Sequence, residues 1–241
     1  MHPTASRPVH SNQSGPHPAL ERTVRRHLAH PFRRPPAAHA REAFARLVER
    51  ADGRSWILDS ACGTGESTAR LAQRHPESWV VGIDQSEERL SCGRRKLAAA
   101  LPDNAILLRT DAPDLWHLMA EAGWRVACHY LLYPNPWPKA EHLGRRWHGH
   151  PRFADLLRLG GRLELRTNWP VYAQEFAHAL RVAGHAATLG VVAAPEAEPI
   201  SPFERKYALS GHTLWLLQAQ LPAGLAWPGA ERQAGNTPVD R

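Results

Sequence analysis

The sequence predicts an α/β fold: a Rossmann-like, seven-stranded, mostly parallel sheet with helices on both faces. Short apolar runs alternate along the chain with segments of helical periodicity, which is the pattern of repeated strand–helix units. Several of these runs end in Asp or Asn. The last two runs have no helical segment between them, and this predicts one antiparallel strand near the end of the chain.

The predicted elements follow one another in this order. The first is a helix over residues 37–51, where apolar residues recur at helical spacing. Seven apolar runs are predicted to be strands: 56–59, 79–84, 105–109, 126–132, 162–167, 186–192 and 214–221. Five further helices, several of them ended by Pro or Gly, are predicted over 66–75, 87–101, 113–122, 153–159 and 170–183. The stretch 194–212 has no periodicity, so we expect it to be irregular.

Residues 133–139 read Tyr-Pro-Asn-Pro-Trp-Pro-Lys and follow the fourth predicted strand. Three alternating prolines remove backbone donors and fix φ, which excludes both helix and strand. We therefore expect an ordered, rigid loop at the carboxyl end of that strand.

The two ends of the chain differ from its middle in composition. Residues 1–36 are rich in Pro, His and Ser and then in Arg, so we expect a disordered basic arm. This arm is either a solvated linker or a contact for nucleic acid. Residues 37–221 form the predicted folded domain, and the Gly- and Pro-rich segment 222–241 is predicted to be a disordered tail.

The 241 residues carry a formal net charge of +7, which suits a polyanionic partner such as nucleic acid. The excess of Arg over only three Lys also fits a GC-rich coding bias. The three cysteines form no C-x-x-C pair, which argues against a disulfide scaffold or a zinc site. No uncharged apolar run approaches the roughly 18 residues of a membrane span, and the N-terminus lacks an apolar signal core. We expect a soluble, cytoplasmic protein.

The stretch from Trp56 to Gly65 organises the chain. A buried strand is predicted to end at Asp59, and a turn of small residues with Gly63 and Gly65 leads into a helix. Glycines let the backbone approach a ligand closely, and a helix start offers unpaired N–H groups. The second apolar run ends at Asp84, where an acid can hold the two hydroxyls of a nucleotide ribose.

Such a turn occurs in NAD sites and in the sites of one other ligand class, which is described below. An ordinary strand–turn–helix unit that binds no ligand is the third possibility. NAD sites carry G-x-G-x-x-G, but no glycine stands three residues after Gly65. Ligands of parallel sheets bind beyond the carboxyl ends of the strands. Five polar residues are predicted at those ends and are expected to form one site: Asp59, Asp84, Asp111, Asn135 and Asn168.

The glycine turn resembles motif I, D-x-G-x-G-x-G, of class I S-adenosylmethionine methyltransferases, with Ala61 in place of the first Gly. Three further stretches, 133–146, 166–172 and 201–207, resemble the bacterial tRNA (guanine-N7)-methyltransferase family. That family carries P-D-P-W-x-K-x-x-H-x-K-R-R, a T-D-x-x-x-Y stretch and T-x-F-E-x-[RK]. The resemblance covers about residues 56–217. It implies a class I methyltransferase fold, S-adenosylmethionine as cofactor and tRNA as partner.

The resemblance also implies a role for each matching residue. The positions that hold S-adenosylmethionine correspond to Asp59, Gly63, Gly65 and Asp84, with Asp84 on the ribose, and to Asp111 at the adenine end. Asn135 matches the Asp of the catalytic loop. The substrate-binding positions correspond to Lys139, Asn168, Ser201 and Glu204. We expect no metal ion and no membrane contact.

Methyl transfer to guanine N7 suits this arrangement. N7 carries an in-plane lone pair, so no proton has to be removed, and catalysis consists mainly of alignment and desolvation. Carboxylates suit the N1–H and N2–H₂ donors of guanine. The basic side chains over 139–152, including Arg145 and Arg146, are expected to hold phosphates. Trp137 either stacks on a base or packs within the protein.

Two residues depart from the family pattern, because Asn135 and Asn168 stand where the family has Asp. A hydrogen bond to a charged group contributes roughly 1.5–3 kcal/mol and a neutral one about 0.5–1.5 kcal/mol. The two changes together therefore predict transition-state binding weaker by about ten- to a hundred-fold. An amide offers one donor and one acceptor, which suits an adenine edge better than the donors of guanine.

Three hypotheses therefore stay open: methylation of tRNA guanine N7, methylation of another base or a small molecule, and a paralogue that binds S-adenosylmethionine or RNA without catalysis. The sequence Asn135-Pro136-Trp137 also partly matches the [DNS]-P-P-[YFW] loop of exocyclic-amine methyltransferases. His148 and His150 form an H-x-H pair, for which a solvated basic loop is favoured over a metal site. The sequence does not indicate an oligomeric state.

Overall fold

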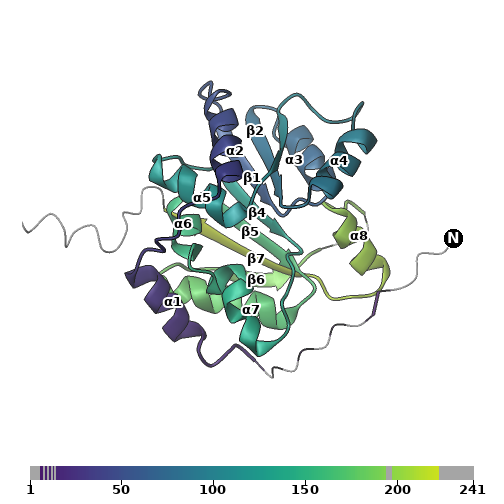
Figure 1. The fold of residues 1–241 in the computed structure, drawn as a ribbon. Coiled ribbons are helices and arrows are strands. Elements are labelled where there is room, and N and C mark those ends of the chain that lie inside the picture. The colour runs from purple at the N-terminus through teal and green to yellow at the C-terminus, as the bar shows by residue number, and fades with distance from the viewer. Residues whose placement is uncertain are drawn as a thin grey trace, which may run out of the picture.

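The computed structural model describes residues 6, 7, 9, 11, 13, 15–193 and 197–222. Seven strands form one sheet in the order β3-β2-β1-β4-β5-β7-β6. Their bounds are β1 Ser55–Ser60, β2 Ser78–Asp84, β3 Ala105–Arg109, β4 Cys128–Leu132, β5 Gly161–Thr167, β6 Thr188–Val191 and β7 Trp215–Leu221. β7 is antiparallel to both of its neighbours, and the other neighbouring strands are parallel (Figure 1). The predicted sheet, with one antiparallel strand, is confirmed.

Helices cover both faces of this sheet (Figure 1). They are α1 Leu20–Ala29, α2 Ala38–Val48, α3 Glu66–Arg74, α4 Glu87–Lys96, α5 Ala112–Glu121, α6 Phe153–Arg158, α7 Pro170–Val182 and α8 Pro202–Leu209, with 3₁₀ turns η1 Ala140–Arg145 and η2 Trp147–Gly149. Successive strand residues face opposite sides, so Leu58 lies in the larger apolar core and Ile57 in the smaller one. The larger core includes side chains of α1, α2, α5, α6 and α7, and the smaller core includes those of α3 and α8.

The expected disorder of residues 1–36 is wrong for helix α1. Leu20 and Val24 lie one helical turn apart and are only 1% and 0% exposed. α1 packs against α6 and α7, while its arginines stay on the exposed face. The many basic residues of this segment made its apolar pair at helical spacing easy to overlook. Burial of that pair stabilises the packing of α1 against the rest of the domain.

The segment 194–212, which we expected to be irregular, contains helix α8. Ser201 Oγ accepts the N–H of Glu204 at 3.1 Å, and Pro202 occupies the first turn of the helix. A Ser followed by Pro and, at the third position, Glu is a capping signal for a helix start. The other predicted elements exist with shifted ends: α4 ends at Lys96 and β4 begins at Cys128, which makes both shorter than predicted, whereas β1 extends over Ser55–Ser60 and is longer.

The predicted tail over 222–241 lies outside the described residues from position 223 onward, so its disorder stays a prediction. Within the described part of the chain, no helix combines the length and apolar character that are needed to cross a membrane.

Asp59 connects β1 to α3 beneath the glycine turn. Its Oδ2 atom accepts hydrogen bonds from the hydroxyls of Ser67 and Thr68 at 2.6 and 2.7 Å, and the residue is completely buried. Its Oδ1 atom has no hydrogen-bond partner among the described residues. Burial raises the pKa of this carboxyl from 3.8 to about 6.

Replacement of Asp59 by Asn is expected to change how stability depends on pH. The folded-state pKa lies above the unfolded-state value, so the folded state binds the proton more tightly. The contribution of Asp59 to the free energy of unfolding therefore falls as the pH rises from about 4 to about 6, by roughly 3 kcal/mol for a shift of about two pKa units. In Asp59→Asn this fall is absent, so the variant gains stability relative to the native protein over that window.

Urea unfolding at about pH 4 and about pH 7 measures this difference. Asp103→Asn makes the same chemical change at an exposed position and is expected to keep the native pH profile. Parallel profiles for the native protein and Asp59→Asn would contradict a raised pKa at Asp59.

Candidate functional site

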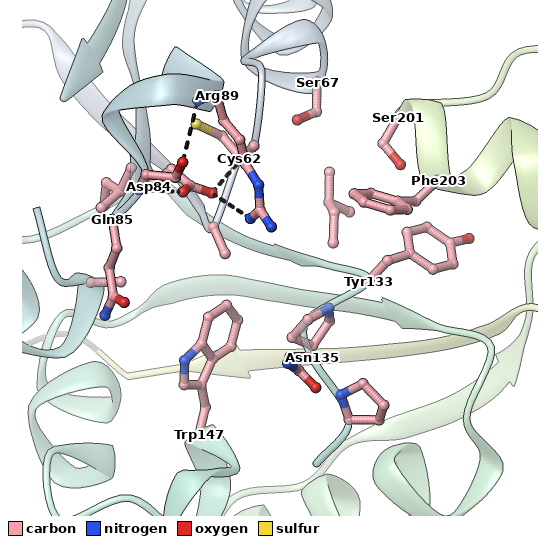
Figure 2. Close-up of a pocket in the computed structure, with 18 of the residues that line it drawn as sticks. Cys62, Ser67, Asp84, Gln85, Arg89, Tyr133, Asn135, Trp147, Ser201 and Phe203 are labelled. Atoms are coloured by element: carbon pink, nitrogen blue, oxygen red, sulfur yellow. Dashed lines mark hydrogen bonds and ion pairs between the residues drawn. The ribbon is translucent and has the colours of Figure 1, made fainter. Parts of the chain in front are cut away.

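A cavity of about 970 Å³ opens along the carboxyl ends of strands β1 to β5. The loops after these strands and the start of α8 form its wall (Figure 2). Six of the residues predicted for the site line it: Gly63, Asp84, Asp111, Asn135, Asn168 and Ser201. Four others are absent from the wall: Asp59, Gly65, Lys139 and Glu204. The structure therefore brings the first six together and places the other four behind or beside them.

The turn between β1 and α3 forms one wall of the cavity. Gly63 and Gly65 have φ values of 62° and 79°, which favour glycine. A Cβ atom on Gly65 would lie 2.7 Å from Cδ2 of Leu107, so the Leu107 side chain would have to shift to admit one. On the other side of the turn, Gly93 of α4 has no Cβ atom, so the carbonyl group of Thr64 can approach this helix closely. The turn is thus held close to its neighbours by positions that only glycine fills without strain.

Asp84 lies at the end of β2 and is almost completely buried. Its Oδ2 atom accepts the N–H of Gly63 at 3.0 Å, and its Oδ1 atom accepts the N–H of Ser86 at 2.8 Å. The guanidinium of Arg89 reaches across from α4, with 3.8 Å between Nη1 and the carboxylate Oδ2 (Figure 2). Two backbone donors therefore fix the carboxylate where it borders the cavity.

Asp111 follows β3 and precedes α5. Its Oδ1 atom accepts a hydrogen bond from Nε2 of Gln85 at 2.7 Å, which joins the loop after β2 to the loop after β3. Burial raises the pKa of the Asp111 carboxyl. Gln85 and Asp111 thereby form a polar edge of the cavity, with an amide and a carboxyl side by side.

The loop over 133–139 has neither helix nor strand, as predicted. Tyr133 and Trp137 have positive φ values of 53° and 44°, a conformation that side chains other than glycine rarely adopt. Asn135 is exposed in the cavity, and its Oδ1 atom accepts the N–H of Trp137 at 3.2 Å. Such backbone conformations persist only where surrounding contacts hold them.

The buried side chain of Arg146 makes contacts that hold this loop in place. Its guanidinium pairs with Glu175 of α7 and donates to the carbonyl oxygens of Trp137 and Lys139 at 3.0 and 3.2 Å. His148 Nε2 lies 2.9 Å from the same Glu175 carboxylate. Because Arg146 is only 2% exposed, the prediction that it holds phosphate is wrong, and it positions the loop instead.

Glu204 holds the start of α8 in place in a similar way. It is completely buried, and its carboxylate accepts hydrogen bonds from the Tyr133 hydroxyl at 2.9 Å, from Arg166 at 2.9 Å and from the N–H of Ile200 at 3.1 Å. These contacts are all internal. Glu204 therefore fixes the start of α8 against the Pro-rich loop over 133–139, while Ser201 at the cap of the helix and Phe203 in its first turn reach the cavity.

Two basic side chains, those of Lys139 and Arg145, lie beside the Pro-rich loop. Lys139 is exposed and lies beside the cavity rather than in its wall. Arg145 lines the cavity, and its guanidinium carbon lies 4.7 Å from the ring centroid of Trp137. The Trp137 ring also meets the His142 ring edge-on at 5.4 Å. Trp137 thus packs against its own loop in this structure.

The solvated loop expected for the H-x-H pair is wrong, because His148 is completely buried. His148 is buried and engaged by Glu175, and Nδ1 of His150 accepts the N–H of Arg152 at 3.1 Å. Burial lowers the pKa of His150 to about 4. Arg152 is buried as well, so it is no more available for phosphate than Arg146.

Among the described residues, one other group has the composition of a cation site: His117, Glu121 and Asp155. The Arg158 guanidinium already contacts the Glu121 carboxylate at 2.6 Å and the Asp155 carboxylate at 3.2 Å. An arginine thus occupies the place that a cation would take. That the protein needs no metal stays a prediction.

Several cavity residues were not predicted from the sequence. Gln85 and Arg89 follow the second strand, where the strand-end rule applied to Asp84 could have included them. Phe203 lies inside the Ser-Pro-Phe-Glu motif and is 47% exposed, with its ring directed into the cavity (Figure 2). Trp147, which rises into the cavity in the same view, follows the Arg-Arg pair and carries no pattern of its own.

The geometry agrees with what comparison with known proteins finds. The sequence profile of a family described as a putative methyltransferase matches residues 54–217. The tRNA (guanine-N(7)-)-methyltransferase of Leifsonia xyli subsp. xyli is 32% identical over 171 residues, which cover 65% of this chain and 71% of that protein. The protein of the same name from Nitrosomonas europaea is 30% identical over 164 residues, which cover 66% of this chain and 72% of that protein.

Solved structures share the fold. The 16S rRNA methyltransferase KamB matches with a TM-score of 0.55 and 18% identity over 74% of this chain and 93% of that one. The antibiotic-resistance methyltransferase Kmr matches with a TM-score of 0.52 and 21% identity over 75% of this chain and 93% of that one. These likenesses confirm the class I methyltransferase fold. The profile and the relatives show more: this chain belongs to the tRNA (guanine-N7)-methyltransferase family of S-adenosylmethionine-dependent enzymes, as a divergent member.

Proposed function

We propose that this protein transfers a methyl group from S-adenosylmethionine to guanine N7 of tRNA. One observation carries the proposal: a single cavity is bordered by the glycine turn with Asp84 and by the loops that hold Asn135 and Asn168. A methyl donor and an acceptor base must share one space for in-line transfer. The relatives named tRNA (guanine-N(7)-)-methyltransferase support guanine N7 as the acceptor.

The first half of the cavity fits S-adenosylmethionine, which when bound supplies an electrophilic methyl group on a sulfonium. Asp84 would accept the two ribose hydroxyls, and the turn at Gly63 leaves room for the ligand to lie against the backbone. Asp111 and Gln85 would take the polar edge of adenine. At Gly63 no heavy atom lies within 4 Å of the place that a Cβ atom would take, and this open space against the backbone supports the fit.

The second half of the cavity fits a base. Guanine N7 needs no general base, so neutral amides at positions 135 and 168 are compatible with a reaction that depends on alignment and exclusion of water. We propose Asn135 in the catalytic loop and Asn168 and Ser201 as base contacts. Phe203 at the rim offers an aromatic face on which a base can stack.

The surface around the cavity fits RNA. Lys139 and Arg145 stand at its mouth, where they would contact phosphates and set the position of the tRNA without reading its sequence. The exposed arginines of α1 and the formal net charge of +7 add to this attraction. A cytoplasmic location, where tRNA is found, belongs to the same proposal.

Asp84→Asn is expected to weaken S-adenosylmethionine binding by about ten- to a hundred-fold, because a charged acceptor is replaced by a neutral one. Isothermal titration calorimetry with S-adenosylmethionine measures the Kd. Asp103→Asn at the exposed surface is expected to bind as the native protein does. A folded Asp84→Asn variant with native affinity would contradict the role of Asp84.

The reaction itself is tested by incubating the native protein with labelled S-adenosylmethionine and bulk tRNA, followed by nucleoside mass analysis. We expect 7-methylguanosine as the labelled product. The variant Asn135→Asp/Asn168→Asp, run beside it, is expected to be faster by up to about a hundred-fold, because the charged acceptors are restored. A methylated adenosine, or no labelled nucleoside from protein that binds S-adenosylmethionine, would overturn the proposal.

A further inference from the structure

A chain of hydrogen bonds runs from the N-terminal segment to the cavity. The carbonyl oxygen of Ser6 lies 3.3 Å from Nε2 of His212, and Nδ1 of His212 lies 3.0 Å from the amide nitrogen Nδ2 of Asn168. The N–H of Ser6 donates to Oγ of Ser210 at 2.9 Å, which anchors the segment beside this histidine. Three segments far apart in the sequence thus meet behind one cavity residue.

The chemistry of the groups fixes the direction of each bond. A backbone carbonyl can only accept, so Nε2 of His212 must carry the proton that it donates to Ser6. In the neutral imidazole the other nitrogen, Nδ1, is then an acceptor. The NH₂ group of Asn168 can only donate, and it meets an acceptor there. The two hydrogen bonds therefore agree with one tautomer of His212: the Asn168 amide donates to Nδ1, and Nε2 donates to the carbonyl oxygen of Ser6.

The histidine ring is also held in place. Its centroid lies 5.4 Å from that of Tyr207, with 26° between the planes, and the N–H of His212 donates to the Tyr207 carbonyl oxygen at 3.0 Å. Tyr207 in turn stacks on Phe203 at 6.1 Å. Because stacking and the Ser6 contact both restrain the ring, Nδ1 stays directed at Asn168.

We propose that His212 is a positioning residue that fixes the Asn168 amide with its carbonyl oxygen toward the cavity. This inference rests on the proposed function, which makes Asn168 a base contact. With one N–H of the amide engaged by His212, Asn168 presents its carbonyl oxygen to the substrate as an acceptor, as the Asp of the family pattern would. An acceptor fits the N1–H and N2–H₂ edge of guanine and disfavours adenine N1, which is itself an acceptor. A fixed orientation thus keeps the acceptor of the family pattern at this position, although without its charge.

Two substitutions of His212 separate its two nitrogens. In His212→Asn the amide places an acceptor near the former Nδ1 position, whereas in His212→Gln a polar group reaches toward Ser6 and no acceptor stands beside Asn168. We expect His212→Gln to raise the KM for tRNA roughly three- to tenfold with kcat unchanged, which is the loss of one neutral hydrogen bond. His212→Asn is expected to stay within about twofold of the native KM, since it keeps the acceptor.

The same His212→Gln change in an Asn168→Asp background is the control. Both oxygens of a carboxylate accept, so its orientation no longer matters, and the rise in KM is expected to disappear. If His212→Gln and His212→Asn lower kcat and the melting temperature alike, and do so in both backgrounds, His212 is only structural and the proposal fails.

Nitrogen-15 NMR of His212 in the native protein tests the orientation without any substrate. We expect the neutral tautomer with the proton on Nε2. A proton on Nδ1 would overturn the inference, because that nitrogen could not then accept from Asn168. If the Nε2–H tautomer is found and the native protein makes no 7-methylguanosine, the proposed function fails while the orientation of Asn168 stands.

Discussion

The close passage of the glycine turn over the ends of β1 and β2 is the constraint on which the site depends. The N–H of Gly63 donates to Asp84, so the carboxylate at the end of one strand is fixed by the loop after the other. Asp59 holds the start of α3 from below through two hydroxyls. Glycine at positions 65 and 93 leaves the space that this passage needs. One wall of the cavity is thereby rigid before any ligand arrives, and such preorganisation favours tight and oriented binding.

The opposite wall is built differently, from loops that need support from behind. Arg146 with Glu175 holds the Pro-rich loop, and Glu204 with Arg166 holds the start of α8. The residues of the family motifs therefore fall into two groups. Asn135, Asn168 and Ser201 border the cavity. The buried charged groups hold the backbone of the Pro-rich loop, where Tyr133 and Trp137 have positive φ values, and the start of α8. Removing one partner of such a buried pair is costly, because the other is left charged and unpaired.

Much of this could be predicted from the sequence, because strands buried in a parallel sheet appear as apolar runs and their ends mark the ligand edge. Helix α1 was missed because its two buried residues are surrounded by arginines, and α8 was missed although its capping signal is local. The burial of Arg146 could not be predicted, since its partner Glu175 stands 29 residues away and is brought near only by the fold. The same holds for His212, which meets Ser6 and Asn168 through tertiary contacts alone.

Hydrogen–deuterium exchange with and without S-adenosylmethionine tests the central claim most directly, because it reports where the ligand binds without any substitution. The arrangement of the cavity predicts slower exchange in the loops over 61–67, 84–89 and 110–113, which follow β1, β2 and β3. Strand β6, at the opposite edge of the sheet, is expected to exchange at the same rate in both samples. Binding that slows exchange elsewhere and leaves these three loops unchanged would contradict the account.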